Sequence, residues 1–149
     1  MTTAFSSALI AHIFFGIIGL ALLQYAFMQI IRTNPPYRII PSVLFFSVSG
    51  FLLSWATGAF YYVVHYGAAV KPRILAGAYP WAHQVGMESK EHIFLLIPFL
   101  VAAVWFSSLA LRSVPEQSLK TAAATAAAVA LTLGGIVAAA GIIISGALR

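Results

Sequence analysis

Ionisable side chains gather in the stretch MESKEHIFLLIPFL, residues 87–100, which places two of the chain's three acidic residues, a lysine and a histidine directly before an apolar run. At 100° per residue, Glu88 and His92 are i and i+4 on one face of a helix, and Glu91 falls about 60° to the side. Neutral imidazole is the commonest metal ligand, and nearby carboxylates ligate or orient it. This face could therefore hold a metal ion or a cofactor.

The histidines are predicted to lie near one side of a membrane. His12 is near the start of the first apolar segment, His65 is near the end of the second, and His92 is near the start of the third. Because helices joined by short connections alternate in direction, these three positions belong to the same leaflet. We therefore expect the three imidazoles to converge on one interior site, with His83 in an outer position.

Ionisable groups are costly inside a bilayer, at on the order of 3 kcal/mol each on insertion scales, so several in one place need pairing or a bound cation. A haem or a metal ion would supply that compensation. The candidate metal ligands are His12, His65, His83, Glu88, Glu91 and His92, and the candidate contacts of a larger cofactor are Tyr61 and Lys90.

Two kinds of cofactor site fit these residues. In the first, two histidines from different helices, His12 with His65 or His92, hold a b-type haem, and Gly16 and Gly19 leave room for the macrocycle. Such a protein would pass electrons between a quinone and a partner protein. In the second, the histidines and carboxylates ligate non-haem iron, copper or zinc, although the chain lacks a strong metal motif such as H-E-x-x-H.

A third hypothesis belongs to another class. A chain of 149 residues with no soluble domain and a fourth segment rich in alanine and glycine is suited to tight contacts in an oligomer or a larger membrane complex. It would then be a non-catalytic structural or assembly subunit. Hydrolytic chemistry is disfavoured because the chain has no aspartate for a Ser-His-Asp triad and no G-x-S-x-G. The absence of cysteine excludes disulfides, iron–sulfur clusters and c-type haem.

The elements that must position these residues follow from composition. The chain is 62% hydrophobic and 7% charged, with a mean hydropathy of +0.98, which is typical of an integral membrane protein. A span needs roughly 20 apolar residues. We expect one membrane domain, residues 1–149, that is all-α and forms an antiparallel up-down-up-down bundle of four transmembrane helices. The predicted helices cover residues 8–31, 41–66, 88–111 and 121–148.

Small and polar residues recur at helical spacing in three of these segments. They are His12, Gly16, Gly19 and Leu23 in the first, Ser47, Gly50, Ser54, Gly58, Tyr61 and His65 in the second, and Gly134, Ala138, Gly141 and Ser145 in the fourth. We expect these stripes to face the bundle interior, where small residues let helices approach closely.

Basic residues lie near the predicted membrane boundaries, so topology and lipid headgroups account for the pI near 9.9 without a nucleic-acid partner. The two sides carry equal numbers: Arg32, Arg38, Arg112 and Lys120 on one, Lys71, Arg73, Lys90 and Arg149 on the other. The first segment has no basic residue before it and two after it. We therefore expect both termini, and the histidines, on the outer face of a cell or inner membrane.

Overall fold

The structure is a computed structural model that describes residues 3–147, all of whose regular elements are helices. Helix α1 is followed by α2, which continues through a π-helix, η1, into the short α3. A second π-helix, η2, leads into α4, and α5 completes the bundle. The bounds are Thr3–Ile30 (α1), Ile40–Tyr61 (α2), Tyr62–Val70 (η1), Lys71–Ala76 (α3), Ala82–Met87 (η2), Glu88–Ser113 (α4) and Gln117–Gly146 (α5).

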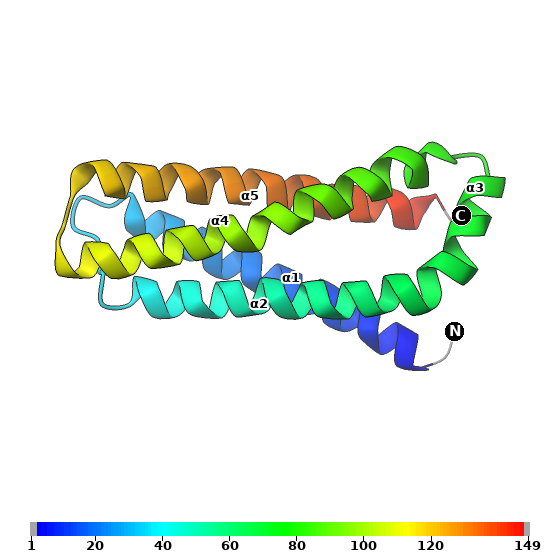
Figure 1. Cartoon of the computed structure of the whole chain (residues 1–149), viewed down its shortest axis with the longest axis horizontal. Coiled ribbons are helices and arrows are strands. Elements are labelled where there is room, and N and C mark those ends of the chain that lie inside the picture. Colours follow the sequence, from blue (N-terminus) through cyan, green and yellow to red (C-terminus); the bar gives the residue numbers. More distant parts are fainter. Residues whose placement is uncertain (1–2, 148–149) are drawn as a thin grey trace.

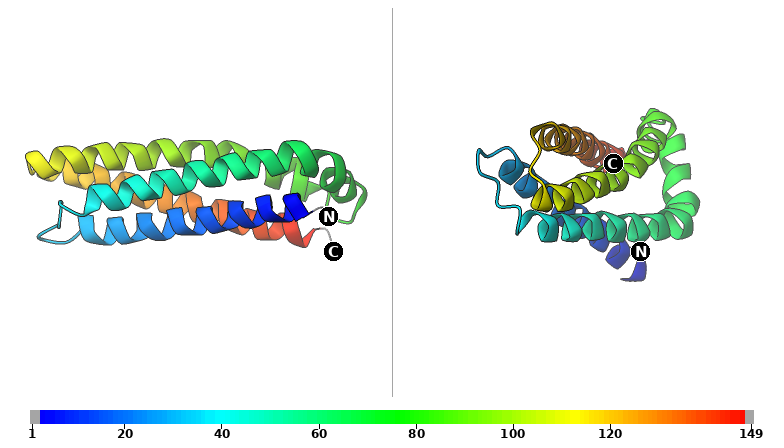
Figure 2. Two further views of the ribbon diagram at one scale, coloured as in Figure 1. Left: turned by 90° about the horizontal axis from the view of Figure 1, so that it is seen from below. Right: turned by 60° about the vertical axis from the view of Figure 1, so that its left-hand side comes forward.

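The four long helices run alternately up and down, and the start of α1 and the end of α5 lie at the same end of the bundle (Figure 1). Helix α1 packs against α2 and α5, and α4 packs against α5 and α2, so the helices close a four-membered ring (Figure 2). The connections at the far end, 31–39 and 114–116, are short, which makes the helices that they join antiparallel neighbours.

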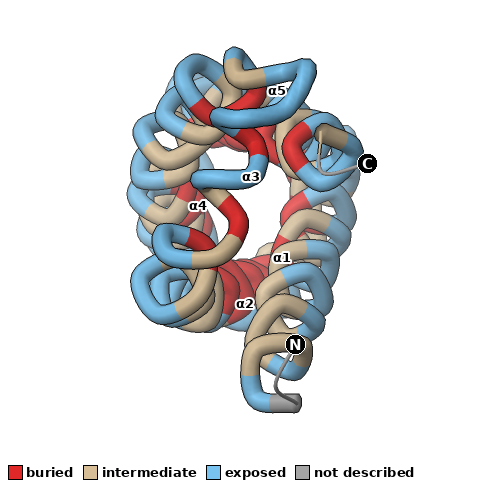
Figure 3. The backbone as a smooth tube through the Cα atoms, turned by 90° about the vertical axis from the view of Figure 1, so that its right-hand side faces the viewer, coloured by how far each residue is buried: buried red, intermediate tan, exposed pale blue. Residues whose placement is uncertain are grey.

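Each of the four helical stretches is long and apolar enough to cross a membrane: Ala4–Ile30, Ile40–Ala76, Ala82–Ser113 and Gln117–Gly146. Buried residues face the inside of the ring, and exposed ones cover its outside (Figure 3). Many of the outward side chains are large and apolar, and Phe99 and Ile142 are each 75% exposed. The prediction of an all-helical chain with four such helices is confirmed.

Glycine and serine line the contact between α1 and α2. A Cβ added at Gly50 would lie 3.1 Å from Gly19 Cα, so the two backbones touch at this point. The buried Ser47 hydroxyl donates a hydrogen bond of 2.8 Å to the Gly19 carbonyl, and a Cβ on Gly16 would lie 3.1 Å from Ser54 Oγ. The room that we expected Gly16 and Gly19 to leave for a macrocycle is therefore filled by α2.

Two segments differ from the expected layout. The second helix does not end at Tyr66: it continues through η1 into α3, which has Pro72 among its first two positions. In α5, Gly134 faces the bundle and packs under Leu20, whereas Ala138 and Ser145 are exposed, so the expected stripe is only partly internal. Of the expected positions, Leu148 and Arg149 lie outside the described residues.

Candidate functional site

His12 is fixed between α1 and α2 by a reciprocal pair of hydrogen bonds. Its Nδ1–H donates to the Ser54 carbonyl at 2.8 Å, and the Ser54 hydroxyl donates to the His12 carbonyl at 2.9 Å. The ring lies directly over Gly58, where an added Cβ would be 2.6 Å from Nδ1. Because Nδ1 carries the hydrogen, Nε2 of the neutral ring keeps its lone pair and can accept a bond.

Two side chains of α4, Phe94 and Lys90, act on this imidazole. The ring of Phe94 meets it edge-on at 6.3 Å between centroids, and the charge of Lys90 acts on it. Lys90 is half-buried, and its Nζ would lie 3.6 Å from a Cβ on Gly141 of α5, so the ammonium reaches across to the neighbouring helix. Because Gly141 has no side chain, it leaves space for the Lys90 ammonium beside α5.

Glu91 points into the bundle rather than outward. Its Oε1 is buried and has no hydrogen-bond partner among the described residues. Tyr62 of η1 and Lys90 both interact electrostatically with this carboxylate. We call His12, Tyr62, Lys90 and Glu91 the interior polar cluster. It joins α1, η1 and α4 near the end of the bundle that carries the termini (Figure 1).

His65 and His92 lie elsewhere. The half-buried His65 ring stacks on Phe5 of α1 at 4.7 Å and is tilted against Tyr61 at 5.4 Å. His92 is exposed, and its Nδ1–H donates to the Glu88 carbonyl at 2.7 Å. Glu88 and His92 line one shallow pocket of about 470 Å³ on the outside of α4.

His83 belongs to a separate packing cluster at the terminal end. It is only 3% exposed, and its Nδ1 lies 3.1 Å from the hydroxyl of Tyr66, which is equally buried. This pair joins η2 to η1, and Tyr66 packs in one cluster with Ile74 and Ile144. The sequence did not predict this pairing, because no helical spacing relates Tyr66 to His83.

The structure does not bring His12, His65 and His92 together, since each ring is held by its own neighbours. Among residues 3–147, no three histidine, aspartate or glutamate side chains lie close enough to hold a metal ion. Binding of a metal or a haem therefore stays a prediction. What the structure does assemble is a half-buried, pre-oriented imidazole, His12, on which the charge of Lys90 acts.

Fold and site together define an all-helical protein with four helices of membrane-crossing length and an interior polar cluster near one end. Comparisons with protein families, with curated proteins and with solved structures gave no match.

Proposed function

We propose that the protein is an integral membrane protein that binds a redox cofactor, haem b or a transition metal, through His12 and takes part in electron transfer. The observation that carries this proposal is the 2.8 Å hydrogen bond from His12 Nδ1 to the Ser54 carbonyl. Histidines that bind metals almost always donate their other ring N–H to a carbonyl or a carboxylate, which fixes the tautomer and the ring orientation.

The interior polar cluster supports the same proposal. Ionisable residues within membrane helices are rare and usually serve a function. Lys90 would pair with an anionic group of a cofactor such as a haem propionate, and the unpartnered Glu91 oxygen would accept a hydrogen bond or ligate a cation. A quinone whose oxygens accept hydrogen bonds is the electron partner that this setting favours, because it moves within the bilayer.

A reduced-minus-oxidised absorption spectrum and metal analysis of the purified protein test the proposal. Haem gives an intense Soret band, and a non-haem centre gives bound iron, copper or zinc without one. We expect His12→Ala to remove most of the bound cofactor. Ser54→Ala, which keeps the carbonyl that orients His12, should retain it. The variants His65→Ala and His92→Ala test whether either histidine supplies a second ligand. His83→Ala should lower cofactor occupancy less than these variants do.

Wild-type cofactor occupancy in His12→Ala would overturn the assignment of this ligand. A protein that is purified folded with no cofactor would overturn the redox proposal as a whole.

A specific observation favours a second candidate, a non-catalytic subunit of a membrane complex. The outer face of α5 presents small residues to its surroundings, and a Cβ on Gly135 would meet nothing within 4 Å. Such a face suits close contact with another helix. Co-purification of a defined partner, together with undiminished cellular function of His12→Ala and His92→Ala, would support this candidate over the first.

A further inference from the structure

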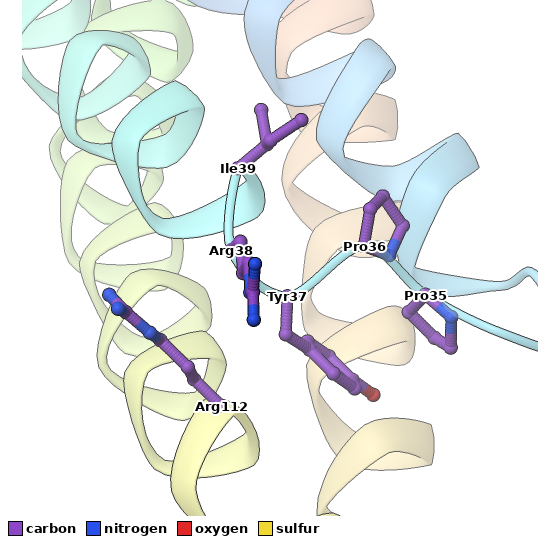
Figure 4. A pocket seen from close by; sticks show the side chains of 6 residues that line it. All are labelled: Pro35, Pro36, Tyr37, Arg38, Ile39 and Arg112. Carbon is purple, nitrogen blue, oxygen red and sulfur yellow. The ribbon is translucent and has the colours of Figure 1, made fainter.

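A basic pocket lies at the end of the bundle opposite the termini and the interior polar cluster (Figures 1 and 4). The connection between α1 and α2 forms one wall, and the last turn of α4 forms the other. The pocket has a volume of about 600 Å³, and its lining residues are Pro35, Pro36, Tyr37, Arg38, Ile39 and Arg112.

The basic side chains at this end fall into two groups. Arg32 donates to Gln29 Oε1 at 3.0 Å, and Lys120 donates to the Arg32 carbonyl at 2.7 Å, so both are engaged within the protein. The side chains of Arg38 and Arg112 make no hydrogen bond and no ion pair with any residue in the range 3–147. Both of these unpaired guanidinium groups line the pocket (Figure 4).

Neither arginine forms an ion pair with a carboxylate of residues 3–147. The one acidic residue in the connections at this end, Glu116, instead accepts a hydrogen bond from the hydroxyl of Ser118 in the first turn of α5. The pocket therefore carries two positive charges that have no counter-ion within the described part of the chain. A guanidinium is a planar fork of donors that matches the oxygens of a phosphate, and it binds phosphate more specifically than an ammonium does.

The remaining lining suits an amphiphilic anion. Pro35, Pro36 and the 54% exposed Ile39 add apolar surface beside the charges. Tyr37 adds an aromatic ring to the lining (Figure 4). The pocket also lies where the apolar stretches begin at Ile40 and end at Ser113, which is the depth of lipid phosphates if these helices cross a bilayer.

We propose that Arg38 and Arg112 together bind a phosphate-bearing anion, either the headgroup of an anionic phospholipid or a free phosphate. The two arginines come from elements that are far apart in the sequence, so a bound phosphate would tie the α1–α2 connection to the end of α4. This inference is independent of the proposed cofactor site, which lies at the other end of the bundle.

Lipid titration followed by native mass spectrometry tests whether the bound anion is a phospholipid headgroup. Wild-type protein is compared with the double variant Arg38→Gln/Arg112→Gln in binding phosphatidylglycerol against phosphatidylcholine. A basic residue near an anionic surface contributes enough to change affinity about fivefold, so we expect a loss of about 25-fold for phosphatidylglycerol in the double variant. The matched control, Lys71→Gln/Arg73→Gln, removes two positive charges at the other end and should keep the wild-type affinity.

A second arm titrates inorganic phosphate into the same proteins in detergent. A loss of lipid binding alone assigns the site to a headgroup, and a loss of phosphate binding alone assigns it to a free anion. Equal binding by wild type and double variant in both arms would overturn the proposal. If the double variant does not fold, the single variants Arg38→Gln and Arg112→Gln replace it, with about fivefold expected for each.

Discussion

His12 and Ser54 exchange hydrogen bonds across the α1–α2 contact, with the imidazole Nδ1–H on the Ser54 carbonyl at 2.8 Å and the serine hydroxyl on the His12 carbonyl at 2.9 Å. Each helix thus satisfies a backbone carbonyl of the other with a side chain. In an apolar surrounding this arrangement does two things at once: it stabilises the helix pair, and it sets the direction of Nε2. The site and the packing of the bundle therefore depend on the same pair of residues.

The position of His12 should be sensitive to Gly58. A methyl group at this position would lie 2.6 Å from His12 Nδ1, closer than any normal contact, so Gly58→Ala must push the ring away from the Ser54 carbonyl. We expect the imidazole ¹⁵N resonances to lose the fixed Nδ1–H tautomer. Gly67→Ala is the matched control, because a Cβ added at Gly67 would lie 3.7 Å from the Tyr62 carbonyl oxygen, which is an ordinary contact distance. Unchanged His12 resonances in Gly58→Ala would contradict the geometry.

The close backbone approach between Gly19 and Gly50 should be important for stability. Since a Cβ on Gly50 would meet backbone atoms of Gly19 at 3.1 and 3.2 Å, Gly50→Ala must separate α1 from α2. We expect it to lower the free energy of unfolding by about 1–3 kcal/mol, as overpacking usually does, measured by denaturation in detergent. Gly135→Ala introduces the same methyl group into open space and should be neutral or slightly stabilising.

A further prediction concerns the hydroxyl of Ser47, which is fully buried and donates to the Gly19 carbonyl at 2.8 Å. Hydrogen bonds between membrane helices are worth about 0.6 kcal/mol on average and up to about 1.7. Ser47→Ala should therefore lower the unfolding free energy by about this amount. Ser49→Ala, which removes a hydroxyl bonded only to the Phe45 carbonyl of its own helix, should cost less. Equal losses in both variants would argue against an interhelical role for Ser47.

The sequence alone was sufficient to predict four apolar helices, because hydropathy and helix length are local properties of the chain. The small-residue stripes on the first two helices were also visible, since spacing shows which residues share a face. Spacing does not show what that face contacts. Gly16 and Gly19 were expected to make room for a cofactor, and they instead pack against Ser54, Gly50 and Phe51 of α2.

The histidine positions show the same limit. Helix direction groups residues by the end of the bundle at which they lie, but the rotation of each helix about its axis decides where a side chain points. His92 is on the outer face of α4, whereas Glu91, one position earlier, points inward. That rotation follows from packing against neighbouring helices, which no single segment encodes. The sequence also did not predict the π-helical turns of η1 and η2, which come directly before Lys71 and Glu88 and belong to a rare helix type.

The Tyr66–His83 pair should stabilise the terminal end of the bundle. Both residues are 3% exposed, so Tyr66→Phe leaves a buried His83 nitrogen without its partner at 3.1 Å. A lost buried hydrogen bond costs about 1–3 kcal/mol. We expect faster hydrogen exchange in η2 (Ala82–Met87), with little change in the middle of α1. The control is Tyr79→Phe, because Tyr79 is 54% exposed and should not alter exchange.

The up-down-up-down arrangement predicts which connections share a side of the membrane, and the absence of native cysteine makes a labelling experiment clean. Asn34 lies in the connection at one end of the bundle, and Ala78 lies in the turn between α3 and η2 at the other end (Figure 1). If the helices cross a bilayer, a membrane-impermeant maleimide should label Asn34→Cys and Ala78→Cys from opposite faces of sealed vesicles. The excess of basic residues after the first helix predicts Ala78→Cys on the outside. Labelling of both from one face would rule out an odd number of crossings between them, and with it the arrangement in which α2 spans the membrane.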